Sequence, residues 1–119
     1  MNYSYDRTAA EKIWHDLFQE AATKFCVDTL KAVVKQLKGK GAIREGSFGS
    51  ATGMVQIGEE SVKLSMGFRG GSVGSVYFEA VGSRVFKESD IGVTAHTPSS
   101  FAILVANALH RAGWNVPAA

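Results

Sequence analysis

The segment Ser61-Val-Lys-Leu-Ser-Met-Gly-Phe68 decides the fold, because apolar residues alternate with polar or small ones along its whole length. Successive side chains of a strand point to opposite faces of the sheet, so one face of this strand is buried and the other is wet. This pattern is typical of antiparallel sheets. The sequence therefore predicts a strand at 61–68.

Further strands are predicted on both sides of this segment. Residues 52–57 precede it and are followed by the turn 58–60, and residues 75–81 alternate again after it. Two weaker segments, 84–87 and 91–95, bring the number of strands to between three and five. The prediction is an antiparallel β-meander.

Helices are predicted before and after the meander. Residues 8–38 contain neither proline nor glycine and begin with Thr8 and Glu11, which fit a capping box. Near the other end, Thr97 and Pro98 suit the first positions of a helix that Gly113 closes. A chain of 119 residues with this order predicts one α+β domain, 1–119, with the C-terminal helix packed on one face of the sheet.

The long helix carries two apolar faces, separated by well over 90° at about 100° per residue. The first contains Trp14, Leu17, Phe18, Ala21 and Phe25, and the second contains Cys26, Leu30, Val33, Val34 and Leu37. About 31 residues make a helix of roughly 46 Å, whereas a compact domain of this size is about 35 Å across. The helix therefore bends or breaks near 27–29, pairs with a second copy through Trp14, Phe18 and Phe25, or binds a different protein.

Basic residues are concentrated after the middle of this helix. Positions 29–44 contain five of them and no acidic residue: Lys31, Lys35, Lys38, Lys40 and Arg44. Such a cluster attracts the phosphates of nucleic acid. However, a net charge of +2 is small for a nucleic-acid-binding protein, and lysines also complement the end of a helix dipole. A solvated face, a nucleic-acid site and a contact for an acidic protein all remain open.

The glycine-rich segment 67–74 is predicted to be a wide hairpin loop. Its residues 70–74 match the G-x-S-x-G pattern of a nucleophile elbow, which requires a helix directly after it, whereas a strand is predicted here. A hydrolase that uses Ser72 is therefore a distant alternative. We expect Arg69, Gly70, Gly71 and Ser72 to form a contact for a partner instead.

Catalytic, cofactor and metal sites are not indicated by the remaining residues. The three histidines lack the spacing of a metal site, and Cys26 is the only cysteine, so no disulfide forms within the chain. No apolar run approaches the roughly 18 residues of a membrane span, and the N-terminus lacks the features of a secretory signal. We expect a cytoplasmic protein without a cofactor.

Together these features predict a small non-enzymatic protein that acts through protein–protein contacts, as an inhibitor, adaptor or accessory protein of the kind found in phages and mobile elements. We expect a homodimer whose self-association uses Trp14, Phe18 and Phe25. The residues expected to bind a partner are Lys31, Lys35, Lys38, Lys40, Arg44, Arg69, Gly70, Gly71 and Ser72. Nucleic-acid binding on the 31–44 basic face is the alternative function.

Overall fold

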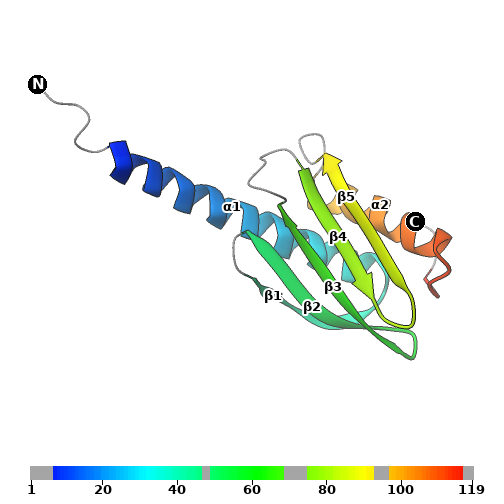
Figure 1. Ribbon diagram of the computed structural model, residues 1–119. Coiled ribbons are helices and arrows are strands. Elements are labelled where there is room, and N and C mark those ends of the chain that lie inside the picture. Colours follow the sequence, from blue (N-terminus) through cyan, green and yellow to red (C-terminus); the bar gives the residue numbers. More distant parts are fainter. Residues whose placement is uncertain (1–6, 47–48, 69–74, 93–96, 117–119) are drawn as a thin grey trace, which may run out of the picture.

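Figure 1 shows the computed structural model of the chain, which describes residues 7–46, 49–68, 75–92 and 97–116. For residues 7–16, 18, 90 and 92 it describes the course of the backbone alone. The elements are α1 (Arg7–Gln36), β1 (Lys40–Glu45), β2 (Ser50–Ile57), β3 (Glu60–Phe68), β4 (Ser75–Val81), β5 (Val85–Gly92) and α2 (Pro98–Arg111). The predicted α+β fold, with a helix on each side of an antiparallel meander, is confirmed.

The sheet has five strands in the order β1-β2-β3-β4-β5, and each strand is antiparallel to its neighbours. Strand β1 is additional to the predicted strands, because this exposed edge strand carries no clear alternation of apolar and polar residues. The two weak segments at 84–87 and 91–95 belong to one strand, β5, which runs to Gly92. Its register with β4 shifts between Val76 and Phe78, and such an irregularity interrupts the alternation in the sequence.

Helix α1 is one helix from Arg7 to Gln36, so it is not broken near positions 27–29. It ends two residues earlier than predicted. Lys38 adopts the left-handed conformation, with φ of 56°, that glycine usually supplies at this position. The Gly39 N–H donates to the Val34 carbonyl at 3.0 Å and closes the end of the helix.

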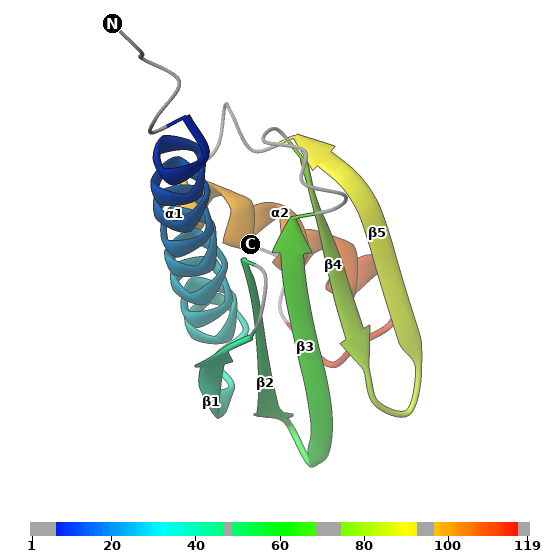
Figure 2. The same ribbon diagram turned by 60° about the vertical axis from the view of Figure 1, so that its left-hand side comes forward.

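Both helices lie on one face of the sheet, and the hydrophobic core lies between the helices and the strands (Figures 1 and 2). Helix α1 contacts α2 and also strands β1, β2 and β3. The second of the two predicted apolar faces of α1 is buried in this core, together with strand residues such as Leu64 and Phe78. Its members are Cys26, Leu30, Val33, Val34 and Leu37.

Helix α2 begins and ends as the sequence predicts. The Ser100 N–H donates to Thr97 Oγ1 at 3.2 Å and the Thr97 N–H donates to Ser100 Oγ at 2.9 Å, which is a capping box. At the other end Gly113 has φ of 97°, and the Trp114 N–H donates to the Leu109 carbonyl at 3.1 Å. The indole of Trp114 is buried, so the chain folds back onto the end of the helix.

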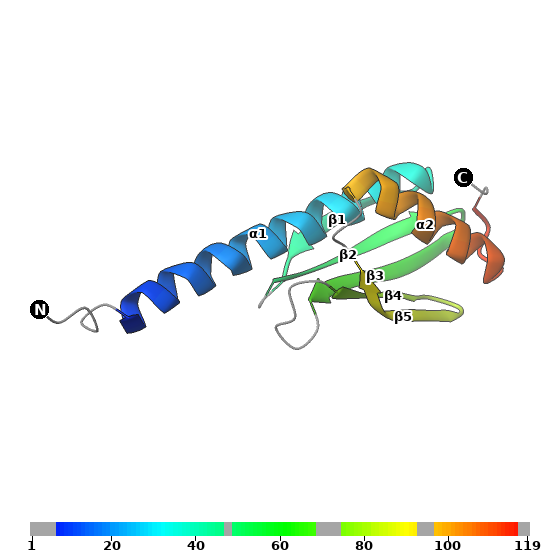
Figure 3. The same ribbon diagram turned by 90° about the horizontal axis from the view of Figure 1, so that it is seen from above.

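The molecule is elongated because α1 is longer than the sheet that it covers. Its principal extents are 64 × 24 × 20 Å, and its radius of gyration is 16.4 Å. A compact chain of this length has a radius of gyration of about 13.5 Å. Figures 1 and 3 show the N-terminal half of α1 leaving the sheet as a nearly straight rod. The helix therefore extends past the sheet instead of bending onto it, so the expected bend or break near 27–29 is wrong.

Candidate interaction surfaces

The first surface is residues 7–21, which we call the projecting half of α1. Beyond it, Ala22 and Cys26 are buried against the rest of the chain, so packing of the helix on the sheet begins at Ala22. Before that point, Ala21 is exposed and Leu17 is 54% exposed. A large apolar side chain is thus open to solvent on a helix that has no sheet beneath it (Figure 3).

Of the three residues predicted to mediate self-association, the structure describes the side chain of Phe25 alone. The side chains of Trp14 and Phe18 lie outside the described part of the chain. The half-buried Phe25 ring packs within its own chain, with its centroid 6.2 Å from that of Phe68 and 6.4 Å from that of Phe101. Phe25 therefore belongs to the border of the core, and less of it is free for a second copy than the sequence suggests.

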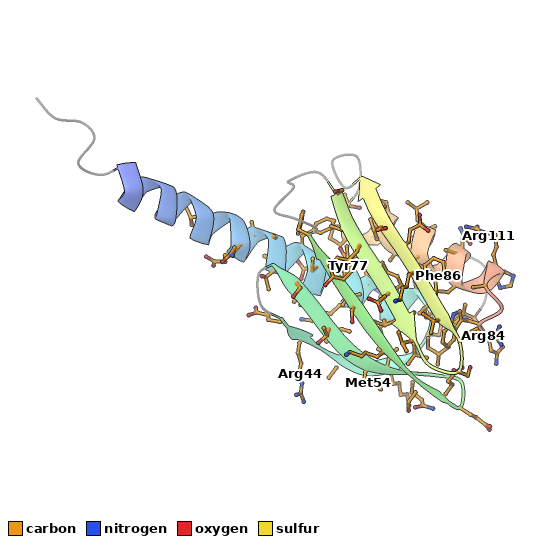
Figure 4. All side chains as sticks on the ribbon, in the orientation of Figure 1. Arg44, Met54, Tyr77, Arg84, Phe86 and Arg111 are labelled. Atoms are coloured by element: carbon orange, nitrogen blue, oxygen red, sulfur yellow. The ribbon has the colours of Figure 1, made fainter. Side chains whose placement is uncertain are left out.

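The second surface is an apolar groove between α2 and the edge strand β5, which we call the α2–β5 groove. It holds about 240 Å³. It is lined by Phe78, Phe86, Glu88, Ile91, Phe101, Leu104, Val105, Ala108 and Arg111. Figure 4 labels Phe86 on β5 and Arg111 on α2, one from each side of the groove.

The groove exists because two helices do not cover five strands. Helix α1 lies over β1, β2 and β3, and α2 packs beside α1. The helix-facing side chains of β5, Phe86 and Ile91, are consequently only half-buried, and Leu104 of α2 is 47% exposed above them.

The third surface is the face of the sheet opposite the helices, which we call the open sheet face. Figure 4, which views the sheet from this side, labels Arg44, Met54 and Tyr77 on it. Its exposed apolar side chains are Met54, Val81 and Val85. Its described charged side chains are the four cations Lys40, Arg44, Lys63 and Lys87 and the single carboxylate of Glu79.

Some of these charges are paired and others are not. Lys87 lies 3.9 Å from Glu79, which is a weak ion pair across β4 and β5. Arg44, Lys63 and Met54 line a hollow in this face, and no carboxylate lines it. Among the described side chains, part of the open sheet face is therefore a positive surface without a neighbouring carboxylate.

Tyr77 is the aromatic residue of this face, and a glycine makes room for it. Gly67 is its partner in the register of β3 and β4, and a Cβ atom there would lie 2.9 Å from Tyr77 Cε1. The ring thus covers Gly67 on the open sheet face. Burial raises the pKa of the Tyr77 hydroxyl, and Cys26 and Glu79 raise it further, so the group is a neutral donor at neutral pH.

The predicted basic cluster is divided between two layers of the molecule. Lys31 and Lys35 are exposed on α1, and Lys38 is exposed just after its end. Lys40 and Arg44 pair with Gln56 and Thr52 of β2, so they extend from the face of the sheet that α1 does not cover. In the structure Arg44 lines the same hollow as Lys63, and Lys63 is not part of the cluster predicted at positions 29–44. Arg69, Gly70, Gly71 and Ser72 lie outside the described residues.

Cys26 has the surroundings of an inert core thiol. It is 0% exposed, and its Sγ donates to the Gly49 carbonyl at 3.4 Å. Burial raises the pKa of Cys26 to about 12, so the nucleophilic thiolate is not formed at neutral pH. Within the described ranges, no group of three or more metal-ligating side chains occurs.

Comparisons with protein families, with curated proteins and with solved structures find no match for this chain. Among the described helices, none is both long and apolar enough to cross a membrane.

Proposed function

We propose that this chain is a non-enzymatic binding protein that acts through protein–protein contacts and associates with a second copy of itself through the projecting half of α1. The observation that carries the proposal is the continuation of α1 for residues 7–21 past its own sheet. The reducing cytoplasm is the setting that we propose, since the single cysteine is buried and unpaired.

A helix of this kind needs a packing partner. Isolated helices shorter than about 12–15 residues are marginal in water, and most helical stability in proteins comes from packing an apolar face. The projecting half contains Ile13, Trp14, Leu17 and Phe18 in its sequence, and Leu17 is exposed. Burying one large apolar side chain contributes about 1.5–3 kcal/mol. Association through this segment would bury the exposed Leu17 and account for the apolar residues in the sequence of a helix that continues past its own sheet.

The proposal shifts the centre of the self-association surface toward the N-terminus. Phe25, packed on Phe68 and Phe101, marks where the core begins, and Leu17 is an exposed apolar residue among the described side chains of the surface. The open sheet face and residues 69–72 then remain available for a different protein. An inhibitor, adaptor or accessory protein would use them in this way.

Light scattering on a sizing column tests the self-association. We expect the nuclease-treated protein to have twice the chain mass of 12.7 kDa at both low and high salt, because apolar contacts are not screened. Leu17→Glu places a charge on the proposed surface and should return the mass to that of one chain. Met54→Glu is the matched control, since Met54 is 55% exposed on the opposite side of the sheet.

Two results would reject this proposal. One is a monomer of wild-type protein at every concentration measured. The other is a Leu17→Glu variant that remains folded by circular dichroism and keeps the dimer mass.

A second candidate function is binding of single-stranded nucleic acid on the open sheet face. The observation in its favour is the set of four cations against one carboxylate, with the Tyr77 ring among them. Lysine and arginine neutralise phosphates, and aromatic rings stack on bases. This site differs from the predicted basic face, because its central pair is Arg44 with Lys63 rather than the lysines of α1.

Fluorescence anisotropy with a labelled single-stranded oligonucleotide distinguishes the two basic sites. If the open sheet face binds, Arg44→Glu with Lys63→Glu should abolish binding, while Lys31→Glu with Lys35→Glu should retain most of it. Affinity should also fall steeply with salt, by roughly tenfold or more over a fourfold rise in salt concentration for several phosphate contacts. Binding that survives the Arg44 and Lys63 changes would rule out this candidate.

A further inference from the structure

We propose that the α2–β5 groove of one copy receives the projecting half of α1 from a second copy. This inference rests on the proposed self-association and names the surface to which the helix binds. The inference is based on two parts of the same chain, the projecting half of α1 and the edge strand β5. The projecting half of α1 is a helix with no sheet beneath it (Figure 3), and β5 is an edge strand whose helix-facing side chains Phe86 and Ile91 are only half-buried.

The dimensions of the groove favour protein side chains over a small ligand. Its volume of about 240 Å³ is below the roughly 300–1,000 Å³ that is usual for small-molecule pockets. The groove is also partly open to solvent, and Leu104 of α2 and Ile91 of β5 are among the side chains that line it. An open groove lined mainly by apolar side chains accommodates anchor residues of an amphipathic helix.

The lengths of the two surfaces also agree. Helix α2 has 14 residues, which is about 21 Å at 1.5 Å per residue. Residues 7–21 of α1 extend over about 22 Å on the same basis. A third helix placed about 8–10 Å from α2, on the side away from α1, would lie over β5 and complete the helical layer.

The walls of the groove match an apolar helix with some charge. Its deep side chains are aromatic or aliphatic, including Phe78 and Phe101, and both are buried. Its charged side chains are Glu88 and Arg111, one from each wall. The projecting half combines apolar residues with charged residues of both signs, so either wall charge has an opposite charge available.

The helix cannot fill the groove of its own chain. Helix α1 is continuous, and its projecting half runs away from the sheet, whereas the groove lies between α2 and β5 (Figures 1 and 3). Folding back would require breaking the helix. A second copy supplies the same segment without this cost, and reciprocal exchange of two such helices closes a symmetric dimer.

Engineered cysteines test the contact directly. Protein carrying Leu17→Cys is mixed with isotopically heavy protein carrying Leu104→Cys or Ala108→Cys, which are one helical turn apart in the groove. Air oxidation at pH 8 should then give light–heavy disulfide dimers in at least tenfold excess over those formed with the control Met54→Cys. A disulfide requires Cα atoms within about 7 Å, so it reports the specific contact. The native Cys26 does not compete, because it is buried with a pKa of about 12.

The outcomes separate this inference from the function on which it rests. Light–heavy disulfides in large excess support the inference, as does a Leu104→Lys variant that weakens the dimer at least tenfold while keeping its helical content. Light–light Leu17→Cys disulfides from a wild-type-like dimer, with no light–heavy product, overturn the groove contact and leave a helix-to-helix association. A monomeric wild-type protein that forms no disulfide overturns both.

Discussion

Shortening Phe78 to alanine is expected to lower the free energy of unfolding by about 3–5 kcal/mol, as removal of a buried aromatic ring usually does. Phe78 is 1% exposed on the helix-facing side of β4, and its ring centroid lies 6.2 Å from that of Phe86. It also forms part of the floor of the α2–β5 groove. Buried residues of α2, Phe101 and Val105 among them, belong to the same core cluster, so the alanine variant would leave a cavity between the two layers. The loss is large against the 5–15 kcal/mol that is typical of a whole domain.

Urea denaturation followed by circular dichroism measures this change. The denaturation midpoint should move to lower urea concentration while the slope stays constant. Val85→Ala is the matched control on the neighbouring strand, where a side chain that is 60% exposed should change the free energy of unfolding by less than about 0.5 kcal/mol. A Phe78→Ala variant within 1 kcal/mol of the wild type would contradict the packing described for this part of the core.

The central strands could be predicted from the sequence because each has one buried and one solvated face. Strand β3 is the clearest example, with Val62, Leu64 and Met66 buried between exposed or half-buried polar residues. Strand β1 could not be predicted, because it does not have one buried and one solvated face. It lies at the edge of the sheet, only Ile43 of its residues is partly buried, and burial is what produces the alternating pattern.

The two apolar faces of the long helix could also be predicted from the sequence. Which of them is buried in the core could not. The Cys26–Leu37 face is buried because a sheet lies under that part of the helix. Whether the rest of the helix bends toward the same sheet depends on tertiary packing, and periodicity contains no information about it. The structure resolves this point with a straight helix that continues past the sheet (Figure 3).

The α2–β5 groove could not be read from the sequence at all. Its lining comes from β4, β5 and α2, and its existence depends on how many strands two helices can cover. The same reasoning applies to the positive hollow of the open sheet face. Arg44 and Lys63 are far apart along the chain and are brought together by the register of β1, β2 and β3. In contrast, the linear cluster of Lys31 with Lys40 is divided between the helix layer and the sheet.

Cys26 should make the protein less stable in alkaline solution. Its thiol is 0% exposed in the folded chain and donates a hydrogen bond to the Gly49 carbonyl, which only the protonated form can do. Burial raises its pKa from 9.0 to about 12. The unfolded chain therefore releases this proton near pH 9, while the folded chain keeps it until near pH 12. Since the folded state binds more protons in this range, stability falls as pH rises.

The expected size of this effect is about 1.4 kcal/mol for each pH unit above 9, which is the linkage slope for one proton. Urea denaturation at pH 8.0, 9.5 and 10.5 measures it, and the change of stability with pH that is due to Cys26 should be absent below pH 8. Cys26→Ala is the control, since alanine leaves the core apolar and has nothing to ionise. Ionisable groups that do not interact with Cys26 are common to both proteins and cancel in the difference. If the two proteins lose stability equally between pH 8.0 and 10.5, the thiol is not held in the buried, hydrogen-bonded position that closes α1 against the Gly49 segment.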